Sequence, residues 1–205
     1  MTDLKRTLLP MMLLGDGQVG KTSLSLRLTG NRFDDSLLTT IGKESYLYET
    51  EIEGNKLKIK IWDTAGQERF KSMSVNVIKN VEGLILTYSI ASRESFNNLS
   101  SWLEQLNNVD DISKKPVIIV GNKLDLEEDR QVSYEEGEKF AKEHNYHFYE
   151  TSAKTGKNVK EAFCDMFEQL YKKFEDEITG KKPTKEKTKL ERDKKNKNKE
   201  KNKCC

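Results

Sequence analysis

The sequence predicts an α/β fold, with a six-stranded, mostly parallel sheet that has one antiparallel edge strand and helices on both faces. Apolar, strand-like segments alternate with helix-like segments along residues 1–175. Several strand-like segments are continuous apolar runs, such as residues 117–120, which is typical of strands covered on both sides. Two others are separated only by Gly54 and Asn55, so we expect them to form an antiparallel hairpin.

The expected strands cover residues 7–14, 44–53, 56–62, 83–89, 116–121 and 146–150. Pro10 removes a backbone donor from the first of them, so we expect that strand to begin at or just after Pro10. The longest apolar run, residues 8–14, is far shorter than the ~20 residues of a membrane-spanning helix. We therefore interpret this run as a buried strand.

Two helices are marked by the residues at their starts. Ser133 and Glu136 predict a capping box for a helix over residues 133–144. Asn158 and Glu161 open the last helix, in which Cys164 lies beside an apolar stripe and is expected to be a packed thiol. The stripe has helical spacing and consists of Val159, Ala162, Phe163, Met166, Phe167 and Leu170.

Charge is distributed unevenly along the 205 residues, although the formal net charge is only +2. Residues 181–203 contain 12 basic and 4 acidic residues, a net charge of +8, so the rest of the chain carries −6. This Lys/Asn/Glu segment has too few apolar residues to form a core. We expect a folded domain over residues 1–178 and a disordered basic tail over residues 179–205.

Cysteine and histidine usage excludes several kinds of site. Of the three cysteines, two are the last residues of the chain, so no disulfide framework is expected and a cytosolic protein is indicated. His144 and His147 are the only histidines and have no cysteine near them, so we do not expect them to bind a metal.

A phosphate-binding loop follows the first expected strand. The pattern G-x-x-x-x-G-K-[ST] is matched by Gly15, Asp16, Gly17, Gln18, Val19, Gly20, Lys21 and Thr22, and Ser23 follows. Glycines allow backbone N–H groups to surround phosphates at the start of a helix. Lys21 is expected to reach the β- and γ-phosphates, and the Thr22 hydroxyl to bind Mg²⁺.

The segment Asn122-Lys123-Leu124-Asp125 predicts that the base is guanine. The Asp125 carboxylate can accept hydrogen bonds from guanine N1–H and the N2 amino group, and adenine lacks this donor pair. Asn122 can hold the loop, while the stem of Lys123 packs on one face of the base. Residues 150–154 (ETSAK) follow the next expected strand. We expect Ser152 to belong to the same site, the Ala153 N–H to contact guanine O6 and the Lys154 stem to stack opposite Lys123.

Two further segments are expected to respond to the γ-phosphate. Asp63, at the end of a strand, can hold Mg²⁺ through water, and Thr40 supplies a second hydroxyl. The N–H of Gly66 can approach the γ-phosphate, and Gln67 can orient an attacking water as the catalytic residue. Two rivals fit the phosphate loop alone, namely an ATP-dependent phosphotransferase and a binding module without turnover.

These motifs together resemble those of the Ras superfamily of small GTPases over residues 7–175, in order and in spacing: GDGQVGKT, TTIG, WDTAGQE, GNKLD and ETSAK. KIKIWDTAGQERF, FNNLSSWL and the terminal Cys204-Cys205 resemble the Rab family. The resemblance implies the small G-protein version of the P-loop NTPase fold, with residues 1–178 as the GTP-binding domain. It also implies that Phe33 stacks near the guanine.

The resemblance further implies Mg²⁺-dependent hydrolysis of GTP to GDP by a monomer that regulates vesicle trafficking. Its implied partners are an exchange factor, a GTPase-activating protein, effectors, Rab escort protein and GDP dissociation inhibitor. A Ras-type signalling GTPase is the nearest alternative. This chain departs from the Rab pattern at positions that face effectors and recycling proteins in the family, which are Ser45, Val77, Ile78 and Ser89.

The tail combines Cys204 and Cys205 with an upstream basic stretch, and two such signals are what stable lipid anchoring requires. We expect prenylation at these cysteines and a location on the cytoplasmic face of intracellular membranes, with a cytosolic pool. The alternatives for such a Lys-rich tail are that it keeps the protein soluble or that it binds RNA loosely. The tail has no aromatic residue for base stacking, so no nucleic acid partner is expected.

Overall fold

The computed structural model describes residues 6–30, 44–63 and 75–180. Its sheet has the strand order β2-β3-β1-β4-β5-β6, and only the β2–β3 pair is antiparallel. The strands are β1 (Leu8–Leu14), β2 (Glu44–Ile52), β3 (Asn55–Asp63), β4 (Gly83–Ser89), β5 (Val117–Asn122) and β6 (His147–Glu150). The predicted fold class is confirmed, including the antiparallel strand at one edge.

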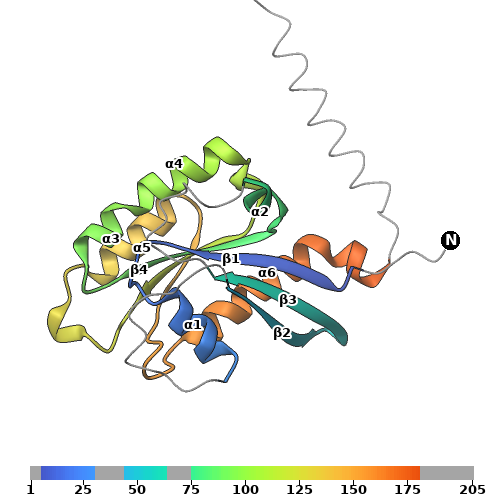
Figure 1. The fold of residues 1–205 in the computed structure, drawn as a ribbon, viewed down its shortest axis with the longest axis horizontal. Coiled ribbons are helices and arrows are strands. Elements are labelled where there is room, and N and C mark those ends of the chain that lie inside the picture. The colour runs from blue at the N-terminus through green and yellow to red at the C-terminus, as the bar shows by residue number, and fades with distance from the viewer. Residues whose placement is uncertain (1–5, 31–43, 64–74, 181–205) are drawn as a thin grey trace, which may run out of the picture. The chain divides into compact units, whose positions relative to one another are not determined.

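Helices cover both faces of this sheet (Figure 1). They are α1 (Lys21–Leu28), α2 (Val75–Asn80), α3 (Arg93–Asn97), α4 (Leu99–Val109), α5 (Tyr134–Glu143) and α6 (Val159–Thr179), with 3-10 turns at Ile112–Lys114 and Glu127–Asp129. The helices α2 to α5 lie on one face, and α1 and the part of α6 before residue 174 lie on the other. None of the helices in the described segments is long and apolar enough to cross a membrane.

Residues 7–173 form one compact unit. A second unit comprises residues 1–6 and 174–205, of which Arg6 and residues 174–180 are described. The unit boundary coincides with non-helical backbone angles at Phe174 inside α6. Within the second unit, Arg6 Nη1 lies 3.1 Å from Glu177 Oε2, and the Arg6 guanidinium lies 3.8 Å from the centre of the Phe174 ring.

Pro10 does not delay the first strand, contrary to our expectation. β1 begins at Leu8 and pairs with β3 from there, whereas its pairing with β4 starts only at Met11. The Pro10 carbonyl accepts from Glu82 N on the β4 side, at 2.7 Å. The missing N–H therefore falls before the β4 ladder begins, and no ladder bond is lost.

The helix starts agree in position with the sequence. Ser133 and Glu136 form the predicted capping box of α5. Asn158 does precede α6, but it has left-handed backbone (φ 57°) and its amide donates to the Glu150 carbonyl at 2.8 Å. The predicted stripe on α6 is buried throughout. Cys164 beside it is half-buried, and burial raises the pKa of its thiol.

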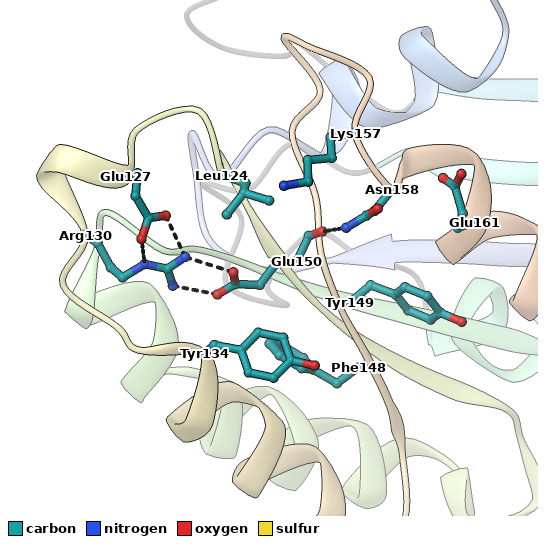
Figure 2. Close-up of a pocket in the computed structure, with 10 residues that line it drawn as sticks. All are labelled: Leu124, Glu127, Arg130, Tyr134, Phe148, Tyr149, Glu150, Lys157, Asn158 and Glu161. Atoms are coloured by element: carbon teal, nitrogen blue, oxygen red, sulfur yellow. Dashed lines mark hydrogen bonds and ion pairs between the residues drawn. The ribbon is translucent and has the colours of Figure 1, made fainter.

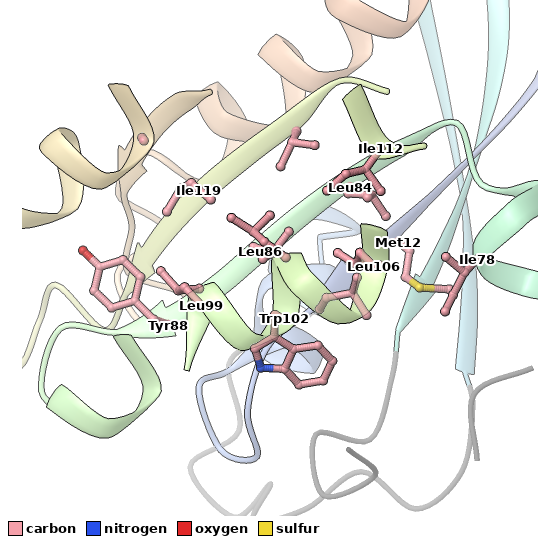
Figure 3. Close-up of a cluster of buried hydrophobic side chains, with 14 of the residues drawn as sticks. Met12, Ile78, Leu84, Leu86, Tyr88, Leu99, Trp102, Leu106, Ile112 and Ile119 are labelled. Carbon is pink, nitrogen blue, oxygen red and sulfur yellow. The ribbon is translucent and has the colours of Figure 1, made fainter. Parts of the chain in front are cut away.

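The core between the sheet and α2 to α5 contains the fully buried Tyr88 (Figure 3). Within the described residues its hydroxyl has no hydrogen-bond partner, which is unfavourable for a buried polar group. Two glycines make room for the ring. A Cβ on Gly121 would lie 2.7 Å from Tyr88 Oη, and one on Gly137 would lie 2.4 Å from the same atom.

We predict that Gly137→Ala destabilises the protein, although alanine is normally the better helix residue. The added methyl would also lie 2.5 Å from Phe148 Cζ, so the core must shift, at a loss of about 1–3 kcal/mol in unfolding free energy. Urea unfolding of wild type and variant under identical conditions measures the change. Tyr88→Phe should by itself stabilise the fold and should reduce the loss from Gly137→Ala. A Gly137→Ala protein as stable as wild type would contradict this account.

Candidate functional site

The loop between β1 and α1 is held against the ends of two neighbouring strands. Gly15 (φ 137°) passes so close to β4 that a Cβ there would lie 2.0 Å from the Thr87 carbonyl oxygen. Gly20 (φ 96°) approaches β5, and its Cβ would lie 2.4 Å from Asn122 Nδ2. Glycine is therefore required at both positions, by backbone angle and by space. Gly20 also brings no side chain to cap the first N–H groups of α1, which suits an anion there.

Lys21 lies across this loop with its side chain buried. Its Nζ donates to the carbonyl oxygens of Gly15 at 2.9 Å and Asp16 at 2.7 Å. Burial lowers the Lys21 pKa to about 8, and the negative charges of Asp63 and Asp16 oppose this shift in part. A cation buried with only partial compensation attracts an anionic ligand strongly, because surrounding water screens it little.

Two of the residues predicted to hold Mg²⁺ lie close to Lys21, one in space and one in sequence. Asp63 ends β3 and is fully buried, and its charge acts on Lys21. Thr22 follows Lys21 in the first turn of α1 and is half-buried. Among the described residues, no group of three or more His, Cys, Asp or Glu is placed so that it could hold a metal ion. A buried carboxylate and a hydroxyl nevertheless fit Mg²⁺, which needs only one or two carboxylates when substrate phosphates complete its shell.

Asn122 joins three segments that are far apart in the sequence. Its Nδ2 donates to the Val19 carbonyl at 2.8 Å, so it holds the loop before α1. Its Oδ1 accepts from Thr151 Oγ1 at 3.1 Å and from Ala153 N at 3.3 Å. The predicted loop-holding role of Asn122 agrees with this geometry. The Ala153 N–H, which we expected to contact guanine O6, is directed to Asn122 in this structure.

The predicted base-recognition residues lie in two adjoining loops. Ser152 Oγ donates to Asp125 Oδ1 at 2.5 Å and accepts from Thr155 N at 3.0 Å. Asp125 is exposed, so its carboxylate is oriented by Ser152 and still accessible to a ligand. Lys123 has left-handed backbone (φ 68°), and burial lowers its pKa. Asp125, Lys123 and Ser152 are thus brought together as the sequence predicted.

Sequence reasoning missed an arginine that supports these loops from α1. Arg27 Nε donates to the Ala153 carbonyl at 2.7 Å, and its Nη2 donates to the Lys154 carbonyl at 2.5 Å. Lys154 itself is exposed. The helix that begins at the phosphate loop therefore also fixes the loop expected to contact the base. No motif marks Arg27 in the sequence, because its partner Ala153 lies 126 residues away and no regular spacing relates the two.

A second missed element is an ion-pair network around Arg130 (Figure 2). Its guanidinium donates to both carboxylate oxygens of the buried Glu150, at 2.6 and 2.8 Å, and to those of Glu127, both at 2.8 Å. Glu150 directly precedes the loop of Thr151–Lys154, so this bidentate pair fixes where that loop starts. The network borders a pocket of about 590 Å³ that also contains Leu124 and Lys157.

Six predicted site residues lie outside the described residues, namely Phe33, Thr40, Gly66, Gln67, Cys204 and Cys205. Their roles stay predictions. Of the four departures noted above, Ser45 is exposed on β2, opposite Trp62, and Val77 is half-buried. Ile78 and Ser89 are only 1% and 3% exposed, so the expected surface role is wrong for both. Ile78 packs in the core, and Ser89 N donates to Ser95 Oγ at 3.0 Å.

The chain matches a known protein family over most of its length. The model of the family described as the Ras family matches residues 10–172. The match runs from β1 into α6 and includes both the phosphate loop and the two base-recognition loops.

We predict that binding of a nucleoside diphosphate is accompanied by proton uptake at Lys21. With a pKa of about 8, about half of the Lys21 side chains would be neutral at pH 8 without nucleotide, and bound phosphates would restore the charge. Uptake should be about half a proton at pH 8, rise toward one near pH 9.5, and fall as the pH drops to 7. Calorimetry in buffers of different ionisation enthalpy measures it. The uptake should persist in Lys123→Met, and a pH-independent value would contradict the assignment.

Proposed function

Because this chain belongs to the Ras family of small GTPases, we propose that it is a Rab-like member that regulates vesicle trafficking from the surface of intracellular membranes. Membership of this family implies the general activity, which is binding of GTP and GDP with Mg²⁺ and hydrolysis of GTP to GDP and phosphate. Beyond this general activity, we propose the guanine contacts, the roles of individual residues, the Rab type and the lipid anchor.

One observation carries the nucleotide specificity. Asn122 binds both the phosphate loop, through Val19, and the loop of Ala153, while Ser152 orients Asp125. A base held between these loops is recognised by the Asp125 carboxylate, whose acceptor pair matches the N1–H and N2 donors of guanine. The same hydrogen bonds keep the base loops at a constant position relative to the phosphate loop.

The residues around the phosphates act mainly by position and charge. Lys21 neutralises negative charge on the β- and γ-phosphates, and its contacts with the Gly15 and Asp16 carbonyls fix the ammonium in the loop. Thr22 and Asp63 would hold Mg²⁺, which when bound neutralises charge on the β- and γ-phosphates. Gln67 is proposed to orient the attacking water, and Gly17 leaves space near the γ-phosphate.

Support for the Rab type comes from residues outside the nucleotide site. Trp62 is half-buried on β3 with Lys60 Nζ 4.1 Å from its ring centre, and it belongs to the Rab-like segment KIKIWDTAGQERF. Trp102 lies in the Rab-like segment FNNLSSWL at the start of α4. The basic residues before Cys204 and Cys205 fit a prenylated anchor on an anionic membrane surface. The partners proposed are the exchange factor, activating protein, effectors, escort protein and dissociation inhibitor of this family type.

We predict that Asp125→Asn changes the preferred base from guanine to xanthine. The amide loses one acceptor for guanine and gains a donor for the xanthine O2, so affinity for GDP should fall by about 100-fold or more while affinity for xanthosine diphosphate rises. Competition against a fluorescent nucleotide measures both. Asp129→Asn, an exposed acid four residues further along the chain, is the matched control and should leave the preference unchanged. Tighter binding of ADP than of GDP by wild type would favour the ATP-dependent rival.

We predict that membrane attachment requires the terminal cysteines. After expression in eukaryotic cells with an N-terminal tag, wild type should divide between membrane and cytosolic fractions, and mass spectrometry should find prenyl groups on Cys204 and Cys205. The Cys204→Ser/Cys205→Ser variant should be entirely cytosolic, whereas Cys164→Ser should behave as wild type. Unmodified terminal cysteines in membrane-purified protein would refute the anchor and leave the nucleotide site intact.

A further inference from the structure

The phosphate loop is tied to α4 through the side chain of Asp16. Its Oδ2 accepts from Asn98 Nδ2 at 2.6 Å, and its Oδ1 accepts from Trp102 Nε1 at 2.9 Å. Asn98 precedes α4, and Trp102 lies one helical turn further on, so both donors project from the same side of the helix start. Each carboxylate oxygen thus has its own donor, and the orientation of Asp16 is determined at both atoms.

The helix end of this connection is rigid. Leu99 and Leu106 are fully buried and Leu103 is 5% exposed, so the inner side of α4 belongs to the core. Trp102 itself is 4% exposed and lies at the margin of the same cluster (Figure 3). A group bonded to Asn98 and Trp102 is therefore fixed relative to the central strands.

The loop end of the connection leads directly to the phosphate-binding lysine. The Asp16 carbonyl accepts from Lys21 Nζ at 2.7 Å, so a single residue bonds to α4 through its side chain and to Lys21 through its backbone. Loss of the side-chain contacts would free the loop on the side that faces α4.

By its charge alone, the Asp16 carboxylate should weaken the binding of a phosphate beside Lys21. The Asp16 carboxylate is close enough to act on the charge of Lys21, and hence on anionic groups bound beside that lysine. Like charges repel, so a carboxylate here weakens phosphate binding unless another contribution outweighs the repulsion. Both donors to Asp16 are neutral, so they orient the carboxylate without cancelling its charge.

We propose that Asp16 is a positioning residue that fastens the phosphate loop to α4 through Asn98 and Trp102 and thereby slows nucleotide release. The inference rests on the proposed nucleotide site and concerns how tightly that site holds its ligand. The fastened loop keeps its N–H groups and Lys21 in the conformation that binds phosphates. When the tether is cut, a smaller fraction of the protein has this conformation, and the apparent affinity falls by that fraction.

The two effects of Asp16 predict changes of opposite sign, which makes the test decisive. The rate of release of a fluorescent GDP analogue is measured with Mg²⁺ and excess unlabelled GDP. If the tether dominates, Asp16→Ala speeds release by about tenfold or more, as expected for losing hydrogen bonds to a charged group. If Asp16 acts only as a charge, the same variant slows release. Glu104→Ala, which removes an exposed acid from α4, should leave the rate unchanged.

The donors provide an independent test, because Asn98→Ala and Trp102→Phe retain the charge of Asp16 and remove one hydrogen bond each. Both should speed release. In the Asp16→Ala background neither should add a further increase, since the bond is already absent. Additive effects in this double-mutant cycle, or unchanged release in Asn98→Ala, would overturn the inference.

The base preference distinguishes loss of the tether from distortion of the whole site, including the base loops. The ratio of affinities for GDP and xanthosine diphosphate should stay at the wild-type value in all tether variants, since Asp125 and Ser152 are untouched. A changed ratio would mean that the whole site is disrupted and would overturn the positioning role. Failure of wild type to bind GDP would refute the proposed function itself, whereas normal wild-type binding with normal release from the variants refutes only the tether.

Discussion

The hydrogen bonds of the Asn122 side chain are the constraint on which the nucleotide site depends. Its amide reaches Val19 in the phosphate loop, while its carbonyl oxygen binds Thr151 and Ala153. The residue is 1% exposed, so an unpaired amide atom there would be strongly unfavourable. The backbone around it is equally restricted, because Gly20 has no room for a Cβ beside this amide. The phosphate loop and the loop proposed to contact the base are consequently parts of one arrangement.

The charged residues around Asn122 have two different roles, which are to interact with bound charges and to hold loops in place. Lys21 and Asp63 are buried and close enough to influence each other, so phosphates and Mg²⁺ enter an environment where charges interact strongly. Arg27 and Arg130 instead stabilise loops, through the carbonyls of Ala153 and Lys154 and through Glu150. The proposed tether of Asp16 belongs to the second kind, since a charged group is used there for its hydrogen bonds.

Local sequence signals predicted the elements well and predicted contacts between elements poorly. The Ser133–Glu136 capping box and the stripe on α6 depend on spacing within a few turns, and both are confirmed. Pro10 was misjudged because the position where β4 pairing begins is not visible in β1 alone. Ile78 and Ser89 were assigned to the surface from a family pattern, but packing against α4 and the bond to Ser95 bury them.

The sequence by itself determined the fold class and predicted the phosphate loop and the residues proposed to recognise the base, because each depends on residue types at short, regular spacing. Only the tertiary structure decided how these pieces are held together. Arg27, Arg130, Asn98 and Trp102 act across 20 to 127 residues of chain, where no periodicity relates donor to acceptor. Such contacts follow from the order of strands in the sheet and the packing of helices on it, which bring distant residues within hydrogen-bond distance.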